Sequence, residues 1–102
     1  MNGLYGALGL AKRAGKIRAG DYAVKDSLSK SRARLVLMDE SLSRSAAAKF
    51  RQLCEAEGVG CEELPEGIIG GAIGKAGCMT AAVEDEAFAA RLAKMAASKR
   101  LT

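Results

Sequence analysis

Two glycine-rich turns carry the residues whose chemistry is easiest to name. In the first, which spans 13–22, Lys16 and Arg18 precede Gly20, Asp21 and Tyr22. Gly20 and Asp21 open a predicted helix, whose first backbone N–H groups lack acceptors and therefore favour an anion such as phosphate. A tyrosine beside them can stack on an unpaired base. The turn therefore predicts a nucleic-acid contact; the alternative is a plain α/β connection with Tyr22 half buried.

The second turn, which spans 73–78, has Lys75 and Gly77 at its centre. Gly74 and Lys75 are similar to the end of a Walker A phosphate loop, but Ala76 stands where Ser or Thr should follow the lysine. This turn also ends a predicted helix, whereas a Walker A loop begins one. We therefore exclude that loop and expect Lys75 and Gly77 to flank a groove.

Catalytic and metal-binding patterns are missing from the chain. It contains no histidine, so the usual general base and the Ser-His and Cys-His nucleophile pairs are absent. Cys54, Cys61 and Cys78 are widely spaced without a C-x-x-C, which argues against zinc and for core thiols in a reducing compartment. The acidic run 84–86 is better explained as a helix start than as a metal site. We predict a protein that is not an enzyme; an unrecognised active site is the weaker alternative.

The charge is distributed unevenly along the chain. The formal net charge is +4, but residues 1–51 hold 11 Lys or Arg against 4 Asp or Glu, whereas residues 52–102 hold 5 against 8. A basic half is the electrostatic signature of a surface that faces nucleic acid. Small proteins also show such asymmetry without binding nucleic acid, so the charge alone does not decide between the two interpretations.

The run Leu35-Val36-Leu37-Met38 predicts a strand that is apolar on both faces. Such a strand must be covered on both faces, as in the centre of an α/β sandwich. Asp39, Glu40, Ser41 and Ser43 follow as helix-starting residues. Hydrophobic spacing and Gly or Pro signals predict the other elements. We expect helices over about 4–11, 21–30, 46–57 (ended by Gly58), 65–73 (with Pro65 as its first residue) and 86–97, and strands over 17–19, 59–64 (an edge strand) and 78–83.

Length and element order bound the architecture. A chain of 102 residues predicts one domain over 1–102, with residues 98–102 frayed. No apolar run reaches the roughly 18–20 residues of a membrane span, and the uncharged start leads into Lys12 and Arg13 without the basic region of a signal peptide. Alternating helices and strands predict the α/β class, as a three-layer α/β/α sandwich around a small mixed sheet.

Several segments together carry a family resemblance. Residues 8–16, Gly20, residues 33–38, 72–75 and 82–89 resemble, in order and with matching spacing, the ribosomal protein superfamily that binds RNA kink-turns. This is the L-seven-Ae and L-thirty-e group, and the chain is most similar to its short bacterial YlxQ/YbxF-like branch. The resemblance implies a three-layer α/β/α fold, a cytoplasmic location, no cofactor and no metal, and a structured RNA partner, either ribosomal or kink-turn-like.

The same resemblance implies where RNA binds, residue by residue. In the family the site is a helix N-terminus with a pattern like G-x-N-E-x-x-K, together with the loop before the last strand. Gly20 matches the glycine, whereas Tyr22, Ala23 and Asp26 replace the Asn, Glu and Lys of the pattern. An acid at position 26 is expected to repel phosphate where a lysine would attract it. We therefore expect binding to structured RNA in general, with poor discrimination of a kink-turn from a plain duplex.

The predicted site combines both turns. We expect Lys16, Arg18 and Lys25 to contact phosphate and Tyr22 to stack on a base. Gly20 and Asp21 present the helix N-terminus, and Lys75 with Gly77 flanks the groove. The predicted function is a ribosomal-protein-like RNA-binding domain, with the ribosome as a further candidate partner. The alternative is a protein-interaction module on the same fold that has lost RNA binding.

Overall fold

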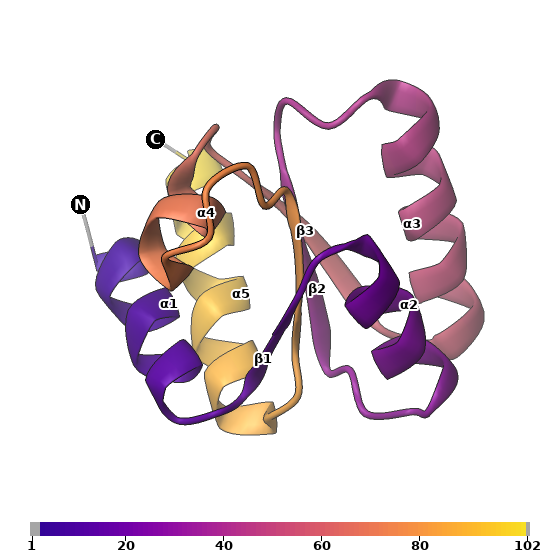
Figure 1. Cartoon of the computed structure of the whole chain (residues 1–102), viewed down its shortest axis with the longest axis horizontal. Coiled ribbons are helices and arrows are strands. Elements are labelled where there is room, and N and C mark those ends of the chain that lie inside the picture. The colour runs from indigo at the N-terminus through magenta and orange to yellow at the C-terminus, as the bar shows by residue number, and fades with distance from the viewer. Residues whose placement is uncertain (1–2, 102) are drawn as a thin grey trace.

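The computed structural model describes residues 3–101 and forms three layers (Figure 1). Helices α1, α4 and α5 cover one face of a four-stranded sheet, and α2 and α3 cover the other. The predicted α/β/α sandwich is therefore confirmed. In chain order the elements are α1 (Gly3–Arg13), β1 (Ile17–Ala19), α2 (Asp21–Ser29), β2 (Leu35–Asp39), α3 (Arg44–Glu57), β3 (Gly60–Leu64), α4 (Ile68–Ile73), β4 (Thr80–Val83) and α5 (Glu86–Leu101).

The sheet is mixed, with the strand order β1-β4-β2-β3. Strand β2 pairs in parallel with β3 and antiparallel with β4, and β4 pairs antiparallel with β1. Every residue of β2 and β4 is buried, as a strand covered on both faces requires. Strand β3 lies at an edge of the sheet, as its glutamates predict.

The two faces of β2 contribute to two separate cores because successive side chains of a strand point in opposite directions. Leu35 and Leu37 belong to the larger core, which is shared with α1, α4 and α5. Val36 and Met38 belong to the smaller core under α2 and α3, where Phe50 and Cys54 are also buried. The cysteines are free thiols, with Cys54 and Cys78 buried.

Side-chain caps and glycines fix the ends of several helices. Ser43 caps α3, because its hydroxyl accepts the N–H of Ala46 at 3.2 Å. Asp85 caps α5 in the same way, through the N–H of Phe88 at 2.9 Å. Gly58 adopts the left-handed conformation that commonly ends a helix, with φ of 69°. The predicted stop at Gly58 and the predicted start of the last helix near residue 86 are therefore confirmed.

Three local predictions are wrong or shifted. Helix α4 begins at Ile68 after Gly67, so Pro65 is not its first residue. Asp39 ends β2 and turns its carboxylate toward the next loop, so it does not start a helix. The last strand begins at Thr80, two residues later than predicted.

Two further expectations concern fraying of the last residues and the absence of a membrane-spanning helix. Helix α5 continues to Leu101 and Thr102 lies outside the described residues, so fraying of 98–102 stays a prediction. Among residues 3–101, no helix combines the length and the apolar character that crossing a bilayer demands.

The buried position of β2 gives a direct stability test. Leu37 is fully buried, so Leu37→Ala should lower the free energy of unfolding by about 2–5 kcal/mol, measured by urea titration. The matched control is Leu10→Ala on α1, where the leucine is 45% exposed, and it should change stability by less than about 0.5 kcal/mol. Equal effects of the two substitutions would contradict a central, doubly covered β2.

Candidate functional site

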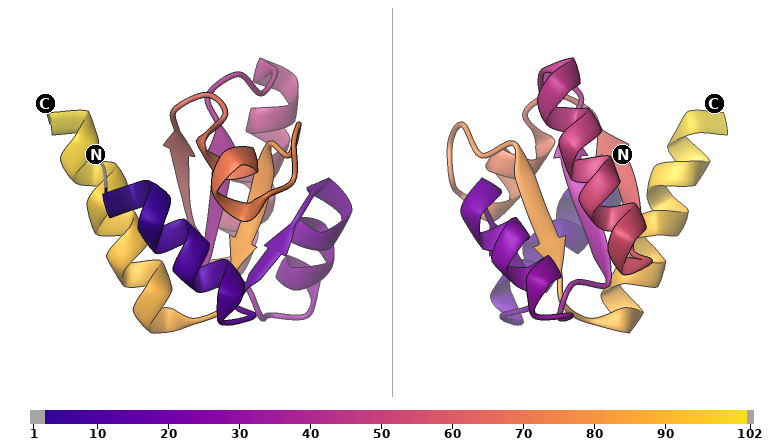
Figure 2. Two further views of the ribbon diagram at one scale, coloured as in Figure 1. Left: turned by 60° about the vertical axis from the view of Figure 1, so that its left-hand side comes forward. Right: turned by 90° about the vertical axis from the view of Figure 1, so that its right-hand side faces the viewer.

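The two glycine-rich turns meet at one end of the sheet. The N–H of Gly20 donates to the carbonyl of Thr80 at 2.9 Å, which ties the start of α2 to the start of β4. Lys75, in the α4–β4 loop, reaches over the same point, with its Nζ 3.8 Å from the position of a Cβ on Gly20. Both views in Figure 2 show this loop beside the first turn of α2. Residues 55 positions apart in the chain thus form one surface, which we call the α2 end.

The N-terminus of α2 is open to a ligand. Gly20 has φ of 102°, which favours glycine, and no side chain caps the helix. The N–H groups of the first turn therefore remain available to an anion. Asp21 does not cap the helix, because its Oδ1 accepts the hydroxyl of Thr80 at 2.7 Å. Tyr22 is 82% exposed, which overturns the alternative of a half-buried ring and leaves it free to stack.

Other predicted site residues lie elsewhere or are engaged. Lys16 lies at the opposite end of β1 from Gly20, where its carbonyl accepts the N–H of Glu84 at 2.8 Å. Arg18 pairs with Asp26 at 3.4 Å and lies 3.8 Å from Glu84. Lys25 turns toward α3, with its Nζ 5.7 Å from the centre of the Phe50 ring. The structure thus gathers Gly20, Asp21, Tyr22 and Lys75 at the α2 end, with Gly77 in the loop that carries Lys75. Lys16 lies at the other end of β1, and Arg18 and Lys25 are engaged by Asp26 and Phe50.

Asp26, which replaces the family's lysine, sits in a charge network. Its carboxylate contacts Lys30 at 3.2 Å on one side and Arg18 on the other. Hydrogen bonding to Lys30, helped by Arg18, outweighs desolvation and holds the pKa of Asp26 below its ordinary value. The negative charge is therefore largely offset within the protein, so the repulsion of phosphate expected from the sequence is weakened.

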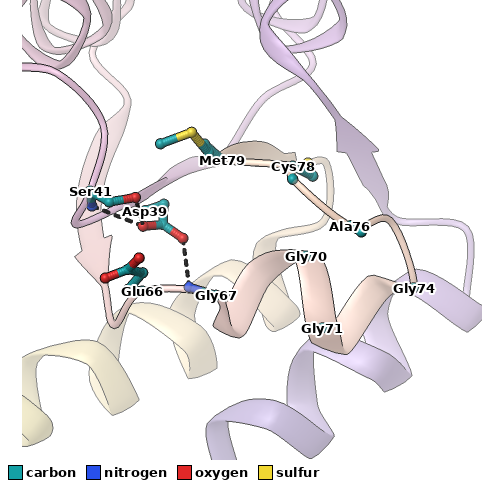
Figure 3. Close-up of a pocket in the computed structure, with 11 residues that line it drawn as sticks. Asp39, Ser41, Glu66, Gly67, Gly70, Gly71, Gly74, Ala76, Cys78 and Met79 are labelled. Carbon is teal, nitrogen blue, oxygen red and sulfur yellow. Dashed lines mark hydrogen bonds between the residues drawn. The ribbon is translucent and has the colours of Figure 1, made fainter.

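A cavity of about 590 Å³ opens next to the α4–β4 loop (Figure 3). Glycines of α4 and of the loop form much of its wall, and Asp39 and Glu66 provide its carboxylates. Sequence patterns did not reveal this cavity because its walls come from three separate segments. They are Asp39 and Ser41 at and after the end of β2, Glu66, Gly67, Gly70 and Gly71 at α4, and Gly74, Ala76, Gly77, Cys78 and Met79 of the loop.

Asp39 joins two of these segments. Its carboxylate accepts the hydroxyl and the N–H of Ser41, at 2.6 and 2.8 Å, and the N–H of Gly67 at 2.8 Å. Burial alone raises the pKa of Asp39, but these hydrogen bonds outweigh it and hold the pKa below its ordinary value. A buried carboxylate with three donors is thus a structural clamp between the end of β2 and the start of α4.

Gly70 allows the loop to fold close against α4. The N–H of Lys75 donates to the carbonyl of Gly70 at 2.9 Å. A Cβ on Gly70 would lie only 2.9 Å from the carbonyl oxygen of Lys75, so a larger residue would displace the loop. The glycine therefore holds the backbone that carries Lys75 toward Gly20. The adjacent glycines at 70 and 71 are the only sequence signal of this close approach.

Comparisons with known proteins agree on the fold. The chain is 35% identical to the RNA-binding protein YlxQ of Bacillus subtilis (strain 168) over 86 residues, which cover 83% of this chain and 86% of that one. A structure of a protein of unknown function from Bacillus halodurans C matches with a TM-score of 0.90 and 22% identity, over 95% and 99% of the two chains. The Giardia lamblia 15.5kD RNA binding protein matches with a TM-score of 0.75 and 15% identity, over 97% and 87%. No family model matches the chain.

The clamp at Asp39 should make stability depend on pH. A carboxyl group with a lowered pKa stabilises the fold above its unfolded value of 3.8, and this contribution disappears as pH falls through the lower folded value. Asp39→Asn should therefore cost about 1–3 kcal/mol at neutral pH, and the difference from the parent should shrink below pH 3.8. Urea unfolding across this range measures the effect, with the exposed Glu57→Gln as control. A difference that stays constant with pH would refute the ionised clamp.

Proposed function

Since the chain belongs to the YlxQ family, we propose that it binds structured RNA through the α2 end. The observation that carries the proposal is the position of Lys75, whose ammonium lies over Gly20 at an uncapped helix N-terminus. Helix N–H groups and an ammonium at one point are suited to a phosphate oxygen. The similarity of the chain to an RNA-binding relative supports the same assignment.

Tyr22 gives this end a second way to hold RNA. Its ring is exposed on the first turn of α2, next to the proposed phosphate position. Stacking of an unpaired base on an aromatic ring contributes about 1–3 kcal/mol and tolerates any base. The carboxylate of Asp21 accepts the hydroxyl of Thr80, so it does not cap the N–H groups of the first turn of α2. The α2 end therefore recognises RNA by one phosphate and one stacked base.

The partner is an RNA with unpaired or splayed bases, and the ribosome is a candidate assembly in which it would be found. A cytoplasmic location accompanies this function. No catalytic step is part of the proposal. The α2 end offers a lysine, an exposed tyrosine and an aspartate that already accepts a hydroxyl, and this set does not form a recognisable pair of general acid and base.

Substitutions at the α2 end test the proposal. Lys75→Ala should reduce the slope of log affinity against log salt by about one, because one phosphate contact is lost. Tyr22→Ala should weaken binding by about 1–3 kcal/mol, whereas Tyr22→Phe should retain it, because the ring stacks without its hydroxyl. Fluorescence titration of a bulged hairpin RNA at several salt concentrations measures both effects.

The matched control is Lys94→Ala, which removes an exposed charge from α5 on the far side of the sheet. It should leave affinity and salt slope close to those of the parent. A parent that binds no RNA at low salt would favour the protein-interaction alternative. Loss of binding in Lys94→Ala equal to that in Lys75→Ala would show that only overall charge matters.

Kink-turn discrimination gives a second prediction. A kink-turn displays donors and acceptors in the groove, where each good side-chain contact contributes about 1–3 kcal/mol. Tyr22 and Ala23 replace the polar pair of the family pattern, so the parent should bind a kink-turn no more tightly than a bulged hairpin, which also offers Tyr22 an unpaired base. Tyr22→Asn with Ala23→Glu should favour the kink-turn, while Asp26 is kept to preserve its ion pairs. A strong kink-turn preference in the parent would contradict this prediction.

A further inference from the structure

The fold places most cations of the basic stretch at the end of the sheet that lies opposite the α2 end. Strand β1 crosses the sheet between Lys16, which precedes it, and Gly20, which follows it, and β4 runs antiparallel beside it. Lys12 at the end of α1 and the α2–β2 loop, which carries Lys30, Arg32 and Arg34, lie at the Lys16 end (Figure 1). We call this surface, formed by Lys12, Lys16, Lys30, Arg32 and Arg34, the cationic end.

Backbone hydrogen bonds anchor this surface around the last residues of β4. The N–H of Glu84 donates to Lys16 at 2.8 Å on one side, and the N–H of Arg34 donates to Val83 at 2.7 Å on the other. Lys16 and Arg34 therefore lie about two strand spacings apart, or roughly 10 Å. All five cations are exposed. Ser31, at φ of 58°, turns the loop, and its carbonyl accepts Nη1 of Arg34 at 3.0 Å.

The acids at the cationic end are mostly engaged. Glu84 accepts the hydroxyl of Ser27 at 2.6 Å and lies near Arg18, and Asp85 caps α5. Glu86 is exposed and lies 3.9 Å from Arg34. Lys12, Lys16 and Arg32 make no ion pair with any residue in the described part of the chain. These three cations are thus available to an outside anion.

The α2 end has the opposite balance. Asp21 adjoins Gly20 at this end, and the carboxylates of Asp39 and Glu66 line the neighbouring cavity. The four-residue path from Lys16 to Gly20 spans about 13 Å of extended chain, which exceeds the screening length of about 8–10 Å at physiological salt. The cations of one end therefore add little attraction for a phosphate at the other. They are therefore available to a separate ligand.

We propose that the cationic end is a second RNA-binding surface, which contacts the phosphate backbone of another RNA helix. This inference rests on the proposed function of the α2 end. Exposed cations on a surface where Lys16 and Arg34 lie roughly 10 Å apart suit the phosphates of a duplex, which proteins bind largely by shape and backbone contacts. Because the two ends face opposite directions, one protein holds two RNA helices apart and in fixed orientation.

Two labelled RNAs test the proposal. A donor-labelled bulged hairpin and an acceptor-labelled plain duplex are mixed with the full chain, energy transfer is measured, and native mass spectrometry gives the stoichiometry. The parent should yield complexes of one protein with two RNAs. Three phosphate contacts should weaken capture of the second RNA about 40-fold between about 50 and 200 mM salt.

A matched pair of triple variants locates the second site. Lys12→Gln, Lys16→Gln and Arg32→Gln together should abolish capture of the second RNA while hairpin affinity stays within about twofold. The control removes the same charges from exposed positions of α3 and α5, as Lys49→Gln, Arg91→Gln and Lys94→Gln, and should behave as the parent. Glu86→Gln should strengthen second-RNA capture, because it removes the exposed acid beside Arg34.

The outcomes separate the two proposals. If the parent binds the hairpin but never a second RNA, or if both triple variants lose the second RNA equally, the second surface is refuted and the α2 end stands. Competition of the duplex by a polyglutamate peptide but not by other RNA would likewise refute it, in favour of an acidic protein partner. If the parent binds neither RNA, the proposed function itself fails.

Discussion

The burial of β2 on both faces is the constraint on which the rest of the structure depends. Four successive apolar residues from Leu35 to Met38 have no face that water can solvate, so helices must cover both sides. The two cores follow, with α1, α4 and α5 on one side and α2 and α3 on the other. Once β2 is central, its neighbours β3 and β4 determine which loops lie at which end of the sheet.

Strand β4 connects this core to the surfaces that bind RNA in our proposals. It lies between β1 and β2, and its polar first residue, Thr80, holds Gly20 and Asp21 at the start of α2. At the opposite end, its last residue Val83 holds Arg34, and Glu84, which follows the strand, holds Lys16. One short buried strand thus positions both the α2 end and the cationic end, and its rigidity fixes the distance between them.

Electrostatics separate the roles of the two ends. The α2 end has a single lysine beside Gly20, and carboxylates line the neighbouring cavity, so in our proposal recognition there depends on helix N–H groups and an exposed ring more than on net charge. At the cationic end, unpaired lysines and an arginine surround β4, while Glu84 and Asp85 are engaged within the protein. The basic half of the sequence predicts one nucleic-acid face, but β1 crosses the sheet between Lys16 and Gly20, so the cations around Lys16 lie at the end opposite the α2 end.

The sequence by itself determined the three-layer class, the central strand, the family and the two glycine-rich turns, because these follow from local periodicity, composition and ordered motifs. It also predicted the meeting of Gly20 with Lys75, through the family pattern. Only the tertiary structure decided that Arg18 and Asp26 neutralise each other, that Lys25 turns toward Phe50, and that Asp39 clamps the cavity instead of starting a helix. These are contacts between segments distant in the chain, and their partners are selected by the packing of the helices on the sheet, which no local pattern encodes.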